Sequence, residues 1–284
     1  MTITVVKPGL QSTIQSRPRT GMRHLGVPAG GAADPLSLAL ANKLLGNAWD
    51  APAIEATLLG PTLRFDTDTS FSLAGATAPI TRNGAGLELH CTHVAEAGDE
   101  LVIGAVECGA RVYLAVPGGF EARRILGSAS TNLQARFGGH EGRALAAGDR
   151  LHTEGRVTKA QVTPREFQPP MTHGWGLRTC AAAETGLLGD EFALFESNWE
   201  VDRRADRMGL RLGGPALSVS SDGRMPSAGV MPGTIQCPED GVPYLLSVDA
   251  GTVGGYPRVA QVARADRHLL GQLRPGDHVR LLRR

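Results

Sequence analysis

The densest group of side chains that could do chemistry lies in a glycine-rich stretch, residues 116–143. Between its glycines, this stretch carries hydroxyl groups, the Asn132 amide, the Arg136 guanidinium and the His140 imidazole. Histidine exchanges a proton near neutral pH, so His140 is a candidate general acid or base, although a loop histidine can also serve as a structural hydrogen-bonding group. The spacings of nucleotide-binding glycine loops are missing. We therefore predict a polar site that is not a phosphate loop.

A second candidate lies where the loop of residues 26–33 leads into a predicted helix at Asp34. Free backbone N–H groups at a helix start attract anions, but Asp34 puts a negative charge there. The alternative role of Asp34 is that of an N-cap, in which its carboxylate accepts hydrogen bonds from the first helical amides.

A third candidate comprises residues 229–243 and 247–257. Gln236 stands between apolar neighbours on a predicted strand, where a buried amide must find hydrogen-bond partners. It could bind a ligand or anchor a turn. Arg207, in the run Asp206-Arg207-Met208-Gly209, is most simply interpreted as one half of a surface ion pair.

The run His90-Cys91-Thr92-His93 has side chains that could ligate a metal ion. Residues 87–91 alternate as a strand, which would send His90 and His93 to opposite faces, so we predict no metal site. The four cysteines form no Cys-x-x-Cys pair and are predicted to be separate buried thiols in a reducing compartment.

Charge and hydropathy exclude several classes of function. The 284 residues carry a net charge of +1, and basic and acidic residues are interspersed, which argues against nucleic acid or an anionic membrane as a partner. No apolar run approaches the roughly 18 residues that span a bilayer, and the first residues lack the pattern of a signal peptide. We expect a cytoplasmic protein.

Short apolar runs separated by turn residues indicate a mainly β chain of the barrel or sandwich class. The predicted strands are residues 3–6, 53–59, 70–73, 101–103, 112–116, 243–248 and 278–282. Residues 34–46 instead predict a helix, because a capping Asp and a first-turn Pro precede an apolar stripe that ends at Gly46. A few short helices should therefore accompany the strands.

A weak internal echo suggests two related halves. Residues 147–151 resemble residues 275–279, and residues 112–116 resemble residues 243–247 at nearly the same separation. The polar stretch of residues 154–170 is the natural boundary. The predicted domains are residues 1–155 and 156–284.

Together, the motifs resemble the family of the 5-oxoprolinase C subunit, which is also described as allophanate hydrolase subunit 2 and is related to the carboxyltransferase region of urea carboxylase. The resemblance runs nearly end to end. It rests on residues 7–15, 26–34, 40–47, 55–61, 130–133, 137–143, 206–212 and 254–257.

The resemblance implies two tandem cyclophilin-like β-barrel domains that act with a homologous B subunit and a third subunit to open 5-oxoproline to glutamate at the expense of ATP. The chain has no Met-Lys-Met biotin tether and no phosphate loop, so any ATP or carboxybiotin chemistry would come from partners. Residues 249–253 depart from the family pattern, since basic and amide side chains are missing there.

The resemblance implies that a small amide or lactam binds beside two catalytic residues, Asp34 and His140. Asp34 would orient a nucleophile or substrate, and His140 would move protons. The predicted substrate-binding residues are Asn132, Arg136, Arg207, Gln236, Gly254, Gly255 and Tyr256. Two alternatives remain: carboxyl transfer from biotin to a urea-like amide, and a regulatory binding protein of the kinase-inhibitor antagonist type.

Overall fold

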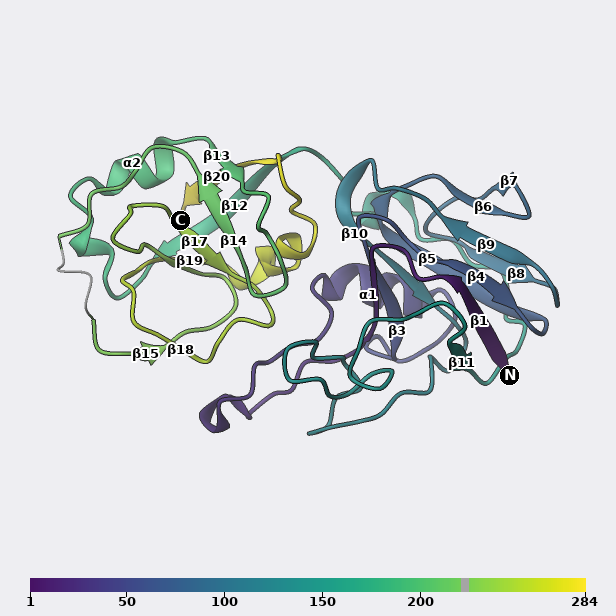
Figure 1. The fold of residues 1–284 in the computed structure, drawn as a ribbon. Coiled ribbons are helices and arrows are strands. Elements are labelled where there is room, and N and C mark those ends of the chain that lie inside the picture. Colours follow the sequence, from purple (N-terminus) through teal and green to yellow (C-terminus); the bar gives the residue numbers. More distant parts are fainter. Residues whose placement is uncertain (221–224) are drawn as a thin grey trace. The chain divides into compact units, whose positions relative to one another are not determined.

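The computed structural model describes residues 1–220 and 225–284, which form two compact units. The first unit comprises Met1–Arg19 and Gly30–Met171, and the second comprises Thr20–Ala29 and Thr172–Arg284 (Figure 1). The chain thus enters the second unit briefly at Thr20–Ala29, returns to the first, and leaves it again after Met171.

This division differs from the predicted boundary after residue 155. Residues 156–171 stay with the first unit because their backbone is hydrogen-bonded to its strands. The Ser70 amide of β5 donates to the Arg156 carbonyl oxygen at 3.0 Å, and the Thr92 amide of β8 donates to the Gln161 carbonyl oxygen at 2.9 Å. Composition alone does not reveal such pairing, because the segment is polar and carries no regular strand pattern.

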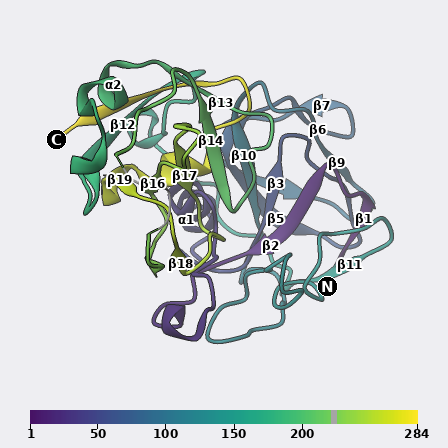
Figure 2. The ribbon, with the colours of Figure 1, turned by 60° about the vertical axis from the view of Figure 1, so that its left-hand side comes forward.

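The first unit contains two antiparallel sheets. The six-stranded sheet has the order β11-β1-β4-β9-β6-β7, and the five-stranded sheet has the order β2-β3-β10-β5-β8; β1 and β11 lie side by side near the N-terminus (Figure 2). The strands are β1 Thr2–Lys7, β2 Gln11–Gln15, β3 Ala53–Thr57, β4 Thr62–Phe65, β5 Thr69–Thr77, β6 Ile80–Arg82, β7 Ala85–Gly86, β8 Thr92–Ala95, β9 Glu100–Ile103, β10 Cys108–Ala115 and β11 Arg150–His152.

Both faces of the five-stranded sheet are covered. One face shares a hydrophobic core with the six-stranded sheet, in which Ile54 and Leu114 are clustered with Leu63 and Leu101. Helix α1 (Pro35–Lys43) covers the other face, where its Leu38 is clustered with residues of β3, β5 and β10. This double cover explains why β5 and β10 are buried along nearly their whole length instead of alternating.

In the second unit, a closed barrel has the order β12-β19-β16-β17-β14-β13-β20, and the parallel pairing of β12 with β20 completes it. A separate pair, β15-β18, lies outside the barrel order. The elements are β12 Gly174–Ala181, α2 Glu191–Glu196, β13 Trp199–Val201, β14 Gly209–Gly213, β15 Ala228–Gly229, β16 Thr234–Gln236, β17 Tyr244–Leu246, β18 Val253–Gly254, β19 Arg258–Val262 and β20 His278–Arg283. Short 3-10 helices occur at Arg23–Leu25, Arg165–Phe167, Thr185–Leu187 and Arg264–Gly271.

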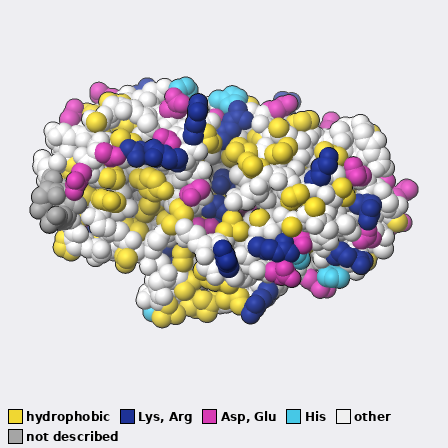
Figure 3. Space-filling view, in the orientation of Figure 1, with side chains coloured by type: hydrophobic (Ala, Val, Ile, Leu, Met, Phe, Trp, Pro, Cys, Tyr) yellow, Lys and Arg dark blue, Asp and Glu magenta, His cyan; other side chains and the backbone are white. Residues whose placement is uncertain are grey.

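The mainly β class with short helices is confirmed, and so is the helix after Asp34. The strand expected over residues 87–91 is wrong, because β7 ends at Gly86, β8 begins at Thr92, and His90 between them has a positive φ of 63°. On the face drawn in Figure 3, basic and acidic side chains are interspersed. Within the described residues, no helix is both long and apolar enough to cross a membrane.

The two helix caps offer a matched test of how burial changes the contribution of a cap. The Asp34 carboxylate is fully buried and accepts from the Leu36 and Ser37 amides at 3.0 Å, whereas Asp190 caps α2 at an exposed position. We expect Asp34→Ala to lower the free energy of unfolding by about 2 kcal/mol and Asp190→Ala by about 0.5–1 kcal/mol. Urea unfolding measures the loss of unfolding free energy in each variant, and hydrogen exchange at Leu36 and Ser37 reports on the Asp34 cap. Equal losses in the two variants would contradict this expectation.

Candidate functional site

In the first unit, the predicted binding residues Asn132 and Arg136 lie on one tight turn. The Asn132 backbone amide donates to the Phe137 carbonyl oxygen at 2.9 Å, and the Asn132 side-chain oxygen accepts from the Ala135 amide at 2.8 Å. Arg136 is exposed near the tip, with a φ of 54°. The turn therefore presents the Arg136 guanidinium to solvent and uses the Asn132 oxygen to hold its own shape.

The base of this loop needs glycine and an arginine that the sequence analysis missed. A Cβ atom on Gly138 would lie 2.3 Å from the Ser130 carbonyl oxygen. The Arg19 guanidinium, which is 1% exposed, donates to that same oxygen and to the Ile125 carbonyl oxygen at 3.3 Å, and it lies 4.6 Å from the centre of the Phe137 ring. Arg19 thus connects the loop to the stretch of chain that follows β2 and precedes the segment Thr20–Ala29.

His140 faces a carboxylate that is itself held by an arginine. Its Nε2 lies 3.4 Å from Oδ2 of Asp149, and the Arg143 guanidinium grips both oxygens of Asp149 at 2.7 and 2.8 Å. The hydrogen bonds from Arg143 lower the pKa of Asp149 to about 2, so this carboxylate is ionised at neutral pH. An ionised partner at this distance can orient the His140 ring.

Asp34 belongs to a different cluster of the first unit. Besides capping α1, its carboxylate accepts a hydrogen bond from the Ser37 hydroxyl at 2.5 Å, and its backbone amide donates to the Tyr113 hydroxyl at 2.7 Å. The Tyr113 hydroxyl in turn donates to the buried Glu55 carboxylate at 2.7 Å. Burial, followed by the negative charges of Glu55 and Asp34, raises the pKa of Tyr113 well above its usual range.

These contacts give Asp34 the N-cap role; its predicted catalytic role stays a prediction. The hydrogen bonds of Asp34 lead to α1 and to Tyr113, whereas those around His140 lead to Asp149 and Arg143. Glu55 enters the predictions only as part of the motif of residues 55–61. Its carboxylate within the largely apolar run of residues 53–59 was a signal that could have identified it.

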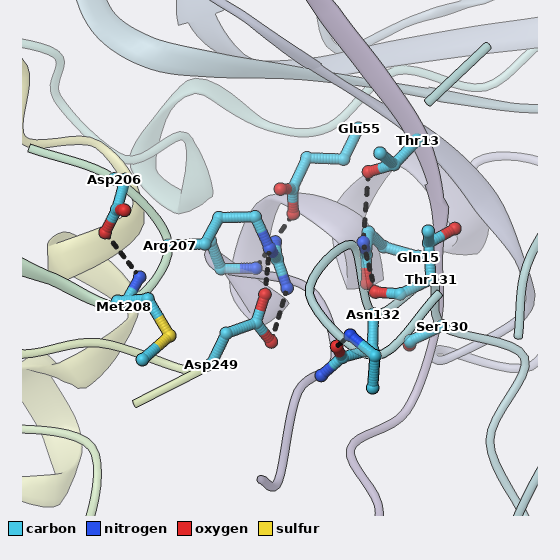
Figure 4. Close-up of polar contacts among 12 residues, drawn as sticks. Thr13, Gln15, Glu55, Ser130, Thr131, Asn132, Asp206, Arg207, Met208 and Asp249 are labelled. Atoms are coloured by element: carbon cyan, nitrogen blue, oxygen red, sulfur yellow. Dashed lines mark hydrogen bonds and ion pairs between the residues drawn. The ribbon is translucent and has the colours of Figure 1, made fainter. Parts of the chain in front are cut away.

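In the second unit, Arg207 forms an ion pair, but a buried one instead of the expected surface pair. Its Nε lies 2.7 Å from Oδ2 of Asp249, and both residues are nearly inaccessible, at 5% and 6% exposure. Figure 4 shows the Arg207 guanidinium directed at the Asp249 carboxylate and, separately, the Gln15 amide of the first unit bonded to Thr13. This ion pair holds Asp249 in place, and Asp249 is the first residue of the segment 249–253 that departs from the family pattern.

The remaining predicted residues are brought together beside the pair β15-β18. The Gln236 amide nitrogen donates to the Tyr256 carbonyl oxygen at 3.1 Å, and a Cβ atom on Gly254 would lie 2.6 Å from that nitrogen. Gly255 follows in the same segment, and the Tyr256 side chain is half exposed at 49%. The structure therefore gives Gln236 the turn-anchoring contact that the sequence left open as one of two roles.

Arg23, another residue that the sequence analysis missed, connects the segment Thr20–Ala29 to these loops. Its guanidinium donates to the Val230 carbonyl oxygen and to the Gly251 carbonyl oxygen, the latter at 3.0 Å. Burial lowers the pKa of Arg23 below its usual value. Val230 and Gly251 both lie in the glycine-rich segments predicted to bind substrate, so Arg23 holds two candidate loops at once.

The described residues contain no cluster of three or more His, Cys, Asp or Glu side chains placed to hold a metal ion. Cys91 Sγ does lie 3.2 Å from Nε2 of His93. All four cysteines are free, as expected, but the prediction that all are buried is wrong, because Cys180 is exposed and Cys91 and Cys108 are half-buried.

Comparison with known proteins identifies the family. The family model for the carboxyltransferase domain, subdomains A and B, matches residues 25–283. The chain belongs to this carboxyltransferase domain family. It is 35% identical to the 5-oxoprolinase C subunit of Escherichia coli, covering 98% of the chain and 89% of the relative, and 34% identical to the Haemophilus influenzae protein of the same name, covering 95% and 87%.

The chain also resembles solved structures over nearly its whole length. The Kluyveromyces lactis urea carboxylase matches with a TM-score of 0.93 and 30% identity, and the protein TTHA0988 matches with a TM-score of 0.89 and 34% identity. Each match covers 99% of this chain, but the chain spans only 27% of the urea carboxylase and 55% of TTHA0988. The Kluyveromyces lactis urea amidolyase is longer still, and the chain spans 18% of it. The family expected from the motifs is confirmed.

The pKa of Asp149 gives a test of the His140 cluster. Because this pKa is about 2 against an ordinary 3.8, ionised Asp149 stabilises the fold above about pH 4, and that contribution is lost as the pH falls toward 2. We expect nuclear magnetic resonance titration of the Asp149 carboxyl carbon to give a midpoint near 2 in the native protein and one closer to 3.8 in Arg143→Gln. An unchanged midpoint in the variant would show that Arg143 is not the cause.

Proposed function

We propose that the chain is the C subunit of an ATP-dependent 5-oxoprolinase, which opens the lactam ring of 5-oxoproline to glutamate together with a B subunit and a third subunit. The observation that carries the proposal is the match to the Escherichia coli 5-oxoprolinase C subunit over 98% of the chain and 89% of the relative. A match of that extent spans both compact units, and so supports a shared role in the complex and not only a shared domain fold.

Opening a lactam requires hydrogen-bond donors for the carbonyl oxygen and a group that delivers a proton to the ring nitrogen. In this proposal His140, oriented by ionised Asp149, moves the proton. Arg136, which is exposed, binds the substrate carboxylate in this proposal.

The other predicted residues hold loops within their own units. Asn132, Gln236 and Arg207 each use at least one polar atom to hold a loop, through Ala135, Tyr256 and Asp249 respectively. We assign them to substrate binding through the loops that they shape. Gly254, Gly255 and Tyr256 form one of these loops.

ATP would be handled by the partner subunits in this proposal. The glycine loops of this chain lack the spacing that cradles phosphates, and several of their backbone groups are already hydrogen-bonded within the fold. In the first unit, the exposed Arg136 side chain remains available to a small substrate.

A second candidate function is carboxyl transfer from a biotinylated partner to an amide. It is favoured by the matching family model and by the TM-score of 0.93 to a urea carboxylase. In that case the same loops would receive carboxybiotin from another protein, since this chain has no tether lysine motif of its own.

The two candidates predict different requirements in the reconstituted complex. We expect the chain, purified with its B subunit and third subunit, to release glutamate from 5-oxoproline only when ATP is present and without a biotinylated protein. Coupled glutamate assays with and without avidin measure this. ATP-dependent bicarbonate consumption that avidin abolishes, with no glutamate formed, would replace the first function with the second.

Arg23 is proposed as a positioning residue for the second-unit loops. We expect Arg23→Ala to speed hydrogen exchange at Val230 and to reduce kcat/KM for 5-oxoproline about tenfold, because two loop carbonyl groups lose a charged donor. The neighbouring His24→Ala is the control, since the His24 side chain is exposed. Faster hydrogen exchange at Val230 with an unchanged kcat/KM would show that Arg23 orders the loop without positioning it for catalysis, and would contradict the proposal.

A further inference from the structure

The first unit holds a polar cavity that shares Gly118 and Arg124 with the glycine-rich stretch of residues 116–143. It has a volume of about 480 Å³ and is lined in part by the turn of residues 46–52 and by Gly118, Arg124, Glu154 and Arg156. A volume of this size is within the range that small-molecule sites occupy. No residue predicted for the catalytic or substrate-binding site is among the described residues that line it.

The walls of the cavity are held by specific contacts. The Asn47 side chain donates to the Val116 carbonyl oxygen at 2.8 Å and accepts from the Gly118 amide at 2.8 Å, which joins the turn to the segment after β10. Gly118 has a φ of 76°, and a Cβ atom there would lie 2.3 Å from the carboxyl carbon of Glu154. The missing side chain of Gly118 therefore makes room for the Glu154 carboxylate.

The charged groups of the cavity fall into two sets. Arg17 is paired with the buried Asp50, with its Nε 2.7 Å from Oδ2. Arg124, Arg156 and Glu154 are exposed, and none of the three makes a side-chain hydrogen bond or ion pair with another residue in 1–220 or 225–284. Two guanidinium groups and one carboxylate thus line the same space with their polar atoms uncommitted.

We propose that this cavity binds a small zwitterionic molecule of the α-amino acid class. The guanidinium groups of Arg124 and Arg156 bind its carboxylate, for which their planar donor geometry is suited. Glu154 accepts hydrogen bonds from its ammonium group. A simple anion satisfies the arginines but is repelled by Glu154, and a simple cation is repelled by the arginines, so the mixed charge of the lining selects a ligand that carries both signs.

Matched probes test this charge pattern. L-glutamate and glutarate have the same five-carbon dicarboxylate skeleton and differ only in the ammonium group. Titration of the full-length protein, followed by calorimetry and by the side-chain resonances of Arg124 and Arg156, should show glutamate binding about tenfold more tightly than glutarate. Glu154→Gln should remove that preference, and the double variant Arg124→Gln/Arg156→Gln should abolish binding of both probes.

Arg165→Gln is the control variant, because Arg165 is an exposed arginine of the same unit that does not line the cavity. Its binding should equal that of the native protein. The proposal is overturned if neither probe shifts the Arg124 and Arg156 resonances in a saturable manner, or if the double variant binds as the native protein does. It is also overturned if glutarate binds as tightly as glutamate. None of these outcomes depends on 5-oxoprolinase activity.

Discussion

The first unit depends on the hydrogen bonds and the ion pair made by the buried carboxylate of Glu55. This carboxylate is 1% exposed in β3, accepts from the Tyr113 hydroxyl at 2.7 Å and from the Ala33 amide at 2.8 Å, and lies 3.4 Å from Nε of Arg111. A buried charge is costly unless such partners surround it, so these groups must adopt one arrangement. That arrangement fixes the residue before Asp34, and therefore the start of the helix that covers the five-stranded sheet.

Buried side-chain contacts also hold the chain at the points where it leaves and re-enters the first unit. Arg19 is held by the Ser130 and Ile125 carbonyl groups, and the chain returns at Gly30, three residues before the Ala33 amide that Glu55 binds. The intervening segment supplies Arg23 to the second unit. A C-terminal fragment beginning at Thr172 would lack this guanidinium and leave the Val230 and Gly251 carbonyl groups without it. The second unit is thus not a separable half of the sequence.

The sequence predicted what depends on local periodicity and missed what depends on distant partners. Alternation and turn residues identified most of the long strands, and the cap and first-turn Pro identified α1. Residues 87–91 also alternate, but the His90 amide donates a hydrogen bond to the Leu73 carbonyl oxygen and the backbone turns there. His140 was selected as a candidate because its loop is dense in polar groups. Arg19 and Arg23 were not, because their partners are backbone carbonyl groups about 100 to 230 positions away.

These arginines explain how loops so rich in glycine can hold a defined shape. Glycine supplies positive φ and close backbone approach but has no side chain to pack, so it increases the entropy lost on ordering. A guanidinium group offsets this cost because it carries several donors and can bind two carbonyl groups at once, as Arg19 and Arg23 both do. The arginine that shapes a loop therefore need not lie in it. A family member that lost one of these two residues would keep its glycine motifs and lose the order on which their function depends.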